Sequence, residues 1–238
     1  MKISTLASPS HGDMLTDYLV KSLHETKSLP EDDLQIVLAD QVAGEKPSFN
    51  SPEWSEFMKI KAKVLLEGLL ATPENDYFLF LDADIIVVND FRDYLDKEMK
   101  TWDLITQSDS PFPQYPNFCT GIICARNCES VRSLFKVVSM VMEGHKFISN
   151  QPSFKNEQEV FTFFAVNRNK FAELKDLKIK TFPFERAFTY GSFAGKVWDG
   201  TDRDFKLPPK DKLLWVHANY CHHEKKIELL ELFKEKLK

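Results

Sequence analysis

Short apolar runs alternate along the chain with stretches in which apolar residues recur at the helical period. This alternation is typical of an α/β domain with a largely parallel sheet. The predicted strands are 2–8, 34–40, one within 77–90, 102–109, 121–127, 179–185 and 213–219. The predicted helices are 14–26, 52–70, 128–144, 156–167 and a C-terminal one with Ile227, Leu230, Phe233 and Leu237 on one face.

The stretch 188–211, between the predicted strands 179–185 and 213–219, is polar and carries three of the eight glycines. This composition predicts a mobile surface loop. No internal repeat occurs, and no linker rich in Pro, Gly or Ser divides the sequence. We therefore expect a single domain over residues 1–238.

The apolar run from Tyr77 to Asp90 carries two carboxylates near its middle, Asp82 and Asp84. An ionised carboxylate is costly to bury unless it is paired or bound to a cation. Ligands of open parallel sheets bind outside the carboxyl ends of the strands, which is where this pair falls. The pair therefore predicts a hard divalent cation with a phosphorylated ligand. The alternative is a loop in which both acids are solvated or cap the next helix.

The composition narrows the possible partners and surroundings of the protein. Lys and Arg number 31 against 36 Asp and Glu, a net charge of -5, which argues against a nucleic-acid partner. No apolar run is long enough to span a membrane, and the N-terminus lacks the pattern of a secretory signal. The cysteines are few and lack zinc-ribbon spacing, which favours free thiols in a reducing cytoplasm over a zinc site at Cys221, His222 and His223.

Two further residues could serve the same site. At about 100 degrees per residue, Lys61 falls inside the apolar arc of its helix, whereas Lys59 and Lys63 point away from it. An inward lysine needs an anionic partner such as a phosphate, unless its ammonium group reaches solvent along its own stem. His217 follows the apolar run 213–216 much as the aspartates follow theirs, so both could meet at one sheet edge. A histidine at a strand end can equally be structural.

The sequence "FLFLDADIIV" resembles the Asp-x-Asp motif of GT-A fold glycosyltransferases, and the order of the other elements resembles that of the nucleotide-diphospho-sugar transferases. The resemblance implies Mn²⁺ or Mg²⁺ held by Asp82, Asp84 and His217. It implies a UDP- or GDP-sugar as donor and a carbohydrate or glycoprotein as acceptor. It further implies that residues 1–100 bind the nucleotide and that residues 101–238 bind the acceptor and end in a helix.

The same resemblance assigns roles to residues of the donor site. The donor contacts that it implies are Ala7, Ser8, Asp40, Lys61, Asp82, Ala83, Thr120, Gly121, and Lys225 or Lys226. In "FCTGIICARN" Cys119 stands where such families place an asparagine, which leaves Thr120 and Gly121 as the matching positions. A glycine there would let substrate approach the backbone closely.

The segment "NEQEVF" resembles the Asp-Gln pair that these families carry near the reacting carbon, with Glu157 in place of the acid. If transfer retains configuration, Glu157 and Gln158 could steady an oxocarbenium-like transition state. The alternative is a helix N-terminus that favours acids. Asp82 and Asp84 are like charges, so we also expect an empty site to be strained and Asp84→Ala to leave the melting temperature unchanged or higher.

Three other classes fit less well. A haloacid-dehalogenase-type phosphohydrolase needs Thr or Val where this chain has Ile86, and it carries its motif on the first strand. A sugar-nucleotide pyrophosphorylase needs a glycine-rich loop after the first strand, where this chain has a single glycine. A non-catalytic sugar-nucleotide-binding protein remains open. Because the sequence starts directly at its first strand, we expect a bacterial or virus-encoded enzyme that works in the cytosol.

Overall fold

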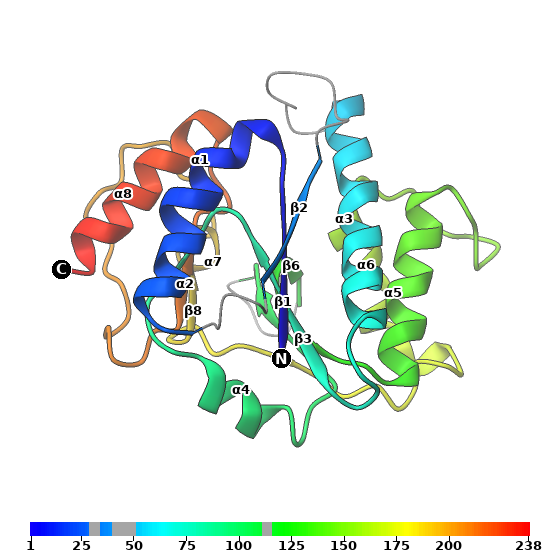
Figure 1. The fold of residues 1–238 in the computed structure, drawn as a ribbon. Helices are drawn as coiled ribbons and strands as arrows, with labels where there is room; N and C mark the ends of the chain where they lie inside the picture. The colour runs from blue at the N-terminus through cyan, green and yellow to red at the C-terminus, as the bar shows by residue number, and fades with distance from the viewer. Residues whose placement is uncertain (29–33, 40–50, 111–115) are drawn as a thin grey trace.

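The structure is a computed structural model that describes residues 1–28, 34–39, 51–110 and 116–238, except the side chain of His223. Its centre is a six-stranded sheet in the order β2-β1-β3-β6-β5-β7 (Figure 1). These strands are β1 (Lys2–Ala7), β2 (Leu34–Leu38), β3 (Tyr77–Asp82), β5 (Leu104–Ser108), β6 (Phe118–Arg126) and β7 (Ile179–Thr181). The predicted single α/β fold with a mixed, mostly parallel sheet is confirmed.

One strand of this sheet, β6, runs against its neighbours. The pairs β1 with β2, β1 with β3 and β5 with β7 are parallel, whereas β6 is antiparallel to both β3 and β5. The first residues of β6 therefore lie at the sheet edge where β1, β3 and β5 end. The register of β5 against β6 shifts between Thr106 and Gln107. Thr106 pairs with Ile123, but the next residue, Gln107, pairs with Cys119. Such a bulge bends a strand and redirects its side chains.

A small second sheet has the order β4-β9-β8. It consists of β4 (Ile85–Val87), β8 (Ala187–Thr189) and β9 (Trp215–His217). Because β4 follows β3 after only two residues, the second sheet is held against the carboxyl end of β3. The pairing of Ile85 with His217 then brings the end of β9 beside the aspartates.

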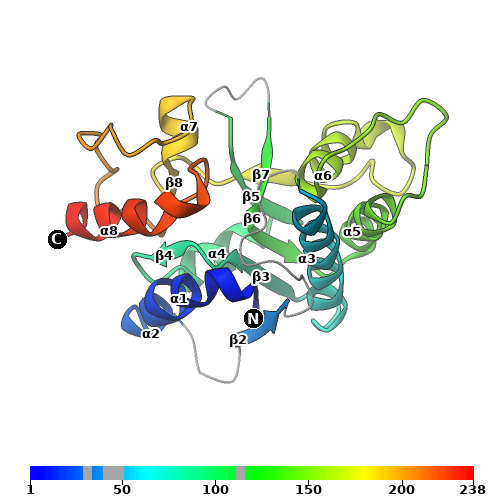
Figure 2. The same ribbon diagram turned by 90° about the horizontal axis from the view of Figure 1, so that it is seen from above.

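Helices cover both faces of the central sheet (Figure 2). On one face lie α3 (Pro52–Leu70), α5 (Glu129–Met142) and α6 (Glu157–Val166). On the other lie the first helical segment, α7 (Tyr190–Ala194) and α8 (Lys226–Lys236), with α4 (Arg92–Glu98) below (Figure 1). The first segment consists of α1 (Gly12–Met14), a π-helical turn (Leu15–Val20) and α2 (Lys21–Glu25).

Buried apolar clusters explain these positions. Leu65 and Leu69 of α3 pack with Phe78 and Phe80 on one face of β3, and Leu79 and Leu81 point into the cluster on the other face. This alternation along β3 is what a strand buried on both faces requires. It fixes the end of the strand, and hence Asp82, with respect to both layers.

The structure corrects two expectations about the C-terminal part. The predicted mobile surface loop 188–211 instead includes the end of β8 and all of α7, and it buries the aromatic rings of Trp198 and Phe205. The polar composition concealed these few large anchors. In α8 the buried face is formed by Leu229, Leu230, Leu232 and Phe233, so the placement of Ile227 on that face was wrong. Ile227 is 45% exposed because it lies at the start of the helix, outside the packed turns.

Candidate active site

Three side chains that could hold a metal ion meet at the carboxyl edge of the central sheet. Asp82 is the last residue of β3, Asp84 follows before β4, and His217 ends β9. One ligand atom from each of them lies within 4.8 Å of the others. Nε2 of His217 is 3.1 Å from Oδ1 of Asp84 and 3.8 Å from Oδ2 of Asp82. In the described part of the chain this is the one such group of three, so Cys221 and His222 form no comparable zinc group.

Lys61 lies beside the first of these carboxylates. As predicted, it points inward from α3, and it is buried. Its Nζ is 2.9 Å from Oδ1 of Asp82 and 3.4 Å from Oε1 of Glu157. Burial acts to lower the pKa of Lys61, but the charges of Asp82 and Glu157 raise it above its usual value. The ammonium group therefore stays charged between two carboxylates.

Lys226 forms an ion pair with the second carboxylate, Asp84, as Lys61 does with Asp82. It lies at the start of α8, and its Nζ donates a hydrogen bond to Oδ2 of Asp84. Burial acts to raise the pKa of Asp84, but the charge of Lys226 lowers it well below its usual range. Lys225 points elsewhere and donates to Glu228 at 2.9 Å. Of the two predicted lysines, the structure therefore brings only Lys226 to the carboxylates.

The expected strain between like charges is not what the structure shows. Each aspartate has its own lysine, Asp82 with Lys61 and Asp84 with Lys226. The expectation was wrong because the sequence does not reveal that two helices from opposite faces deliver ammonium groups to the same point. Asp84→Ala would therefore remove a buried partner of Lys226 rather than relieve repulsion.

Gly121 packs directly against the metal-binding group. A Cβ atom at this position would lie 2.3 Å from Cε1 of His217 and 2.6 Å from Oδ2 of Asp82. Both distances are shorter than any carbon contact allows. The glycine is therefore required because the protein's own imidazole and carboxylate occupy the space above the backbone, a reason that differs from the substrate approach expected from the sequence.

The predicted residues of α6 contact the same part of β6. The hydroxyl of Thr120 donates to Oε1 of Glu157 at 2.7 Å, and the backbone N–H of Thr120 donates to Oε1 of Gln158 at 3.4 Å. Glu157 is buried, and its Oε2 has no hydrogen-bond partner in the described structure. A buried oxygen without a partner costs free energy, so it is suited to accept a hydrogen bond from a bound ligand.

Three polar residues at this edge were missed by the sequence analysis. Gln107 and Asp109 flank the end of β5, and Asn219 follows β9. Asn219 donates to Oδ1 of Asp109 at 2.7 Å, and Gln158 donates to its Oδ2 at 3.1 Å. Burial raises the pKa of Asp109 above its usual value. Asp109 and Asn219 come directly or soon after a strand with buried apolar residues, the same signal that singled out Asp82 and His217, whereas Gln107 lies within β5.

The remaining predicted donor contacts lie around this group or outside the described residues. Ala7 and Ser8 are buried at the end of β1, and Ser8 shares a 2.8 Å hydrogen bond with Nδ1 of His11. Ala83 is buried between the two aspartates. Asp40 lies outside the described residues.

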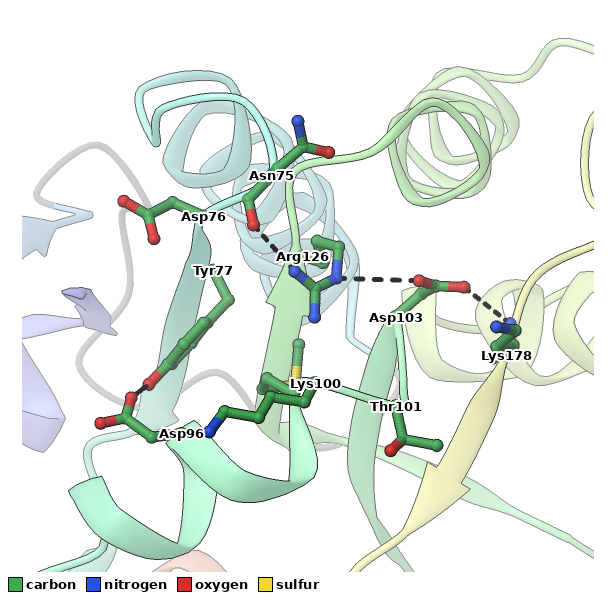
Figure 3. Close-up of a pocket in the computed structure, with 10 residues that line it drawn as sticks. Asn75, Asp76, Tyr77, Asp96, Lys100, Thr101, Asp103, Arg126 and Lys178 are labelled. Carbon is green, nitrogen blue, oxygen red and sulfur yellow. Dashed lines mark hydrogen bonds and ion pairs between the residues drawn. The ribbon is translucent and has the colours of Figure 1, made fainter.

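A cavity of about 330 Å³ lies at the opposite edge of the sheet (Figure 3). Arg126 points across it and donates to the carbonyl of Asn75 at 2.8 Å, while its Nε is 3.8 Å from Asp103. The phenol of Tyr77 donates to Asp96 on its other side. Its charged groups are thus largely paired with one another. The convergent carboxylates, imidazole and lysines all lie at the other edge.

The chemistry of the donor set fits a divalent cation. Two carboxylates and one imidazole offer the hard oxygen ligands that Mg²⁺ and Mn²⁺ take, together with one nitrogen that suits Mn²⁺ better. Three protein ligands leave coordination positions for the oxygens of a phosphorylated ligand. Lys61 and Lys226 add positive charge next to that place.

Comparisons with known proteins agree with this fold. The fold is similar to that of the glycosyltransferase involved in glycosylation of the major capsid of PBCV-1, with a TM-score of 0.58 and 14% identity over 97% of this chain and 100% of that one. The fold is also similar to that of the galactosyltransferase LgtC in complex with donor and acceptor sugar analogs. The TM-score is 0.51 and the identity 12%, over 97% of this chain and 95% of that one. For the glycosyltransferase GlyE of Streptococcus pneumoniae TIGR4 the TM-score is 0.52 and the identity 14%, over 100% of this chain and 64% of that one. No curated protein matches the sequence.

The mixed sheet, with aspartates at the carboxyl edge of β3, defines the GT-A class of glycosyltransferase folds. The family model of nucleotide-diphospho-sugar transferases matches residues 21–230. The chain therefore belongs to the nucleotide-diphospho-sugar transferase family and is a glycosyltransferase. Among the described residues no helix is long and apolar enough to cross a membrane.

Proposed function

We propose that this protein is a metal-dependent glycosyltransferase that moves a sugar from a nucleoside-diphosphate sugar to an acceptor hydroxyl with retention of configuration. The observation that carries the metal dependence is the group of Asp82, Asp84 and His217, with ligand atoms within 4.8 Å of one another. A divalent cation held there would offset the negative charge that develops on the departing diphosphate. UDP- and GDP-sugars are the candidate donors, and the imidazole ligand favours Mn²⁺ over Mg²⁺.

The two lysines would bind the diphosphate. Lys226 reaches Asp84 from the first turn of α8, so its ammonium group lies where a phosphate oxygen next to the metal would be. When Asp84 binds the cation, Lys226 would exchange the carboxylate for that phosphate. Lys61 remains fixed between Asp82 and Glu157 and holds Asp82 in place.

The donor site would extend from these residues toward the nucleoside on one side and toward the sugar on the other. Ala7, Ser8 and Asp40, which follow β1 and β2, would contact the nucleoside, so residues 1–100 form the nucleotide-binding half. Thr120, Gly121 and Ala83 would line the sugar pocket. Residues 101–238 would bind the acceptor, a carbohydrate or a glycoprotein.

The four cysteines are free thiols, which supports a reducing location such as the cytosol.

Retention is supported by the state of the two residues at the start of α6. Glu157 is paired with Lys61 and accepts from Thr120, and Gln158 is an amide. Gln158 cannot deprotonate an acceptor hydroxyl, as inversion requires, and one oxygen of Glu157 is already engaged by Lys61 and Thr120. Both could instead stabilise positive charge near the anomeric carbon. The anomeric configuration of the product, read by NMR, tests this: an inverted product would contradict retention and would point to Asp109 as the base.

The metal-dependent transfer is tested with a panel of UDP- and GDP-sugars, each with Mn²⁺, Mg²⁺ or EDTA. We expect free nucleoside diphosphate to be released with a divalent cation and not with EDTA. Asp84→Asn and His217→Ala should abolish the release. Release of inorganic phosphate from a phosphoester would instead support a phosphohydrolase, and tight donor binding without turnover would support a non-catalytic protein.

A further inference from the structure

Gln107 is a buried residue of β5 that makes one contact of particular interest. Its Oε1 lies 2.8 Å from Nδ1 of His217, and both residues are only 1% exposed. Gln107 reaches the imidazole because it lies just beyond the bulge of β6 against β5. The ring nitrogen that faces the carboxylates is therefore not the one that Gln107 contacts.

The orientation of the Gln107 amide is fixed from its other side. Its Nε2 faces the backbone carbonyl of Ala187 at 3.5 Å. The opposite orientation would place the amide oxygen against this carbonyl oxygen and is therefore disfavoured. Since Oε1 can only accept, Nδ1 of His217 must carry a proton and donate it.

A neutral imidazole has only one N–H, so a proton on Nδ1 leaves a lone pair on Nε2. This lone pair points at Oδ1 of Asp84, 3.1 Å away. Without a positive charge between them, two such lone pairs repel each other. The tautomer that Gln107 selects is thus the one that suits a cation between His217 and Asp84.

We propose that Gln107 is a positioning residue that holds His217 in the Nδ1-protonated tautomer, so that Nε2 is available to bind the metal ion. The inference deepens the metal dependence proposed above and rests on it. Partners of this kind orient metal-binding histidines, and their removal typically lowers metal affinity about 10- to 100-fold.

The test compares the unmodified protein with Gln107→Leu, which removes the acceptor, and Gln107→Glu, which keeps one. Mn²⁺ alone is the probe, and free Mn²⁺ is measured by electron paramagnetic resonance. We expect the dissociation constant to rise about 10- to 100-fold in Gln107→Leu and to stay within a few-fold in Gln107→Glu. Gln151→Leu is the matched control, because the side chain of Gln151 forms its hydrogen bonds in the described structure with the backbone of His145 and Phe147.

A second readout reports the tautomer directly. In ¹⁵N-histidine-labelled, metal-free protein at pH 8, the His217 ring should carry its proton on Nδ1 in the unmodified protein and on Nε2 in Gln107→Leu. Loss of packing alone would weaken Mn²⁺ binding without moving the proton. The proposal is overturned if both proteins show the same tautomer or if the Mn²⁺ affinity of Gln107→Leu is unchanged. If the unmodified protein binds no Mn²⁺, the metal dependence itself fails, which is a different result.

Discussion

The ammonium group of Lys61 lies 2.9 Å from Asp82 and 3.4 Å from Glu157 and links α3 to both the end of β3 and the start of α6. Lys61→Met should destabilise the protein by about 3–5 kcal/mol, because two carboxylates lose their buried cation. Addition of Mn²⁺ should restore part of this loss by neutralising Asp82. Thermal unfolding with and without Mn²⁺ measures both effects.

Lys59 on the same helix provides the control. Its ion pair with Glu56 is exposed, and such pairs contribute little to stability. Lys59→Met should therefore unfold at nearly the temperature of the unmodified protein, and Mn²⁺ should stabilise the two proteins equally. Equal melting temperatures for the two variants would mean that the Lys61 pair is energetically unimportant.

Gly121→Ala should damage the site more than the fold. Because the added Cβ would lie 2.3 Å from His217 and 2.6 Å from Asp82, both side chains must move away from each other. We expect Mn²⁺ affinity and transfer to fall at least about tenfold, and stability to fall by about 1–3 kcal/mol. At Gly12 an added Cβ meets nothing within 4 Å, so Gly12→Ala should leave metal binding unchanged. Normal Mn²⁺ affinity in Gly121→Ala would refute the close packing.

Lys226→Met should have opposite effects on the two ligands. Lys226 competes with a cation for Asp84, so Mn²⁺ alone should bind the variant more tightly. The nucleoside diphosphate should bind at least about tenfold more weakly in the presence of Mn²⁺, since a charged hydrogen bond to phosphate is lost. Titration calorimetry measures both constants. Lys225→Met, which removes a contact with Glu228 only, should change neither. Weaker binding of both ligands to Lys226→Met would show that the lysine is merely structural.

Asp109 should impose a pH dependence on stability. Burial raises its pKa, so the folded state holds the proton more tightly than the unfolded state, in which the pKa is about 3.9. The contribution of Asp109 to stability is then greatest below about pH 4 and declines as the pH rises through the raised folded pKa. In Asp109→Asn this decline is absent. The melting temperature of the variant, relative to that of the unmodified protein, should therefore increase between pH 4 and 7. A constant difference over this range would contradict the raised pKa.

Much of the scaffold could be predicted from the sequence. The helix 52–70 was predicted with the bounds of α3, and a buried strand was predicted within 77–90, where β3 runs from Tyr77 to Asp82. Both follow from strong local periodicity, which depends little on tertiary packing. The meeting of Asp82, Asp84 and His217 was also expected, since each follows an apolar strand.

The features of the site that could not be predicted from the sequence are contacts between elements that are distant along the chain. The pairing of Lys61 with Glu157 and the bond of Gln107 to His217 each join segments that only the sheet order brings together. The same holds for the choice between Lys225 and Lys226, since adjacent residues at a helix start point in different directions. The buried ring of Trp198 within a polar segment shows that one anchor can outweigh the average composition around it.

Lys226 follows all the other proposed donor-site residues in the chain, and it is held in place by the buried leucines of α8. During synthesis the N-terminal parts of a domain emerge first. The two aspartates and most of the sheet therefore leave the ribosome well before the lysine that neutralises Asp84. The proposed diphosphate-binding surface would therefore form only once α8 has been translated and has docked, after both aspartates and the central sheet are already available.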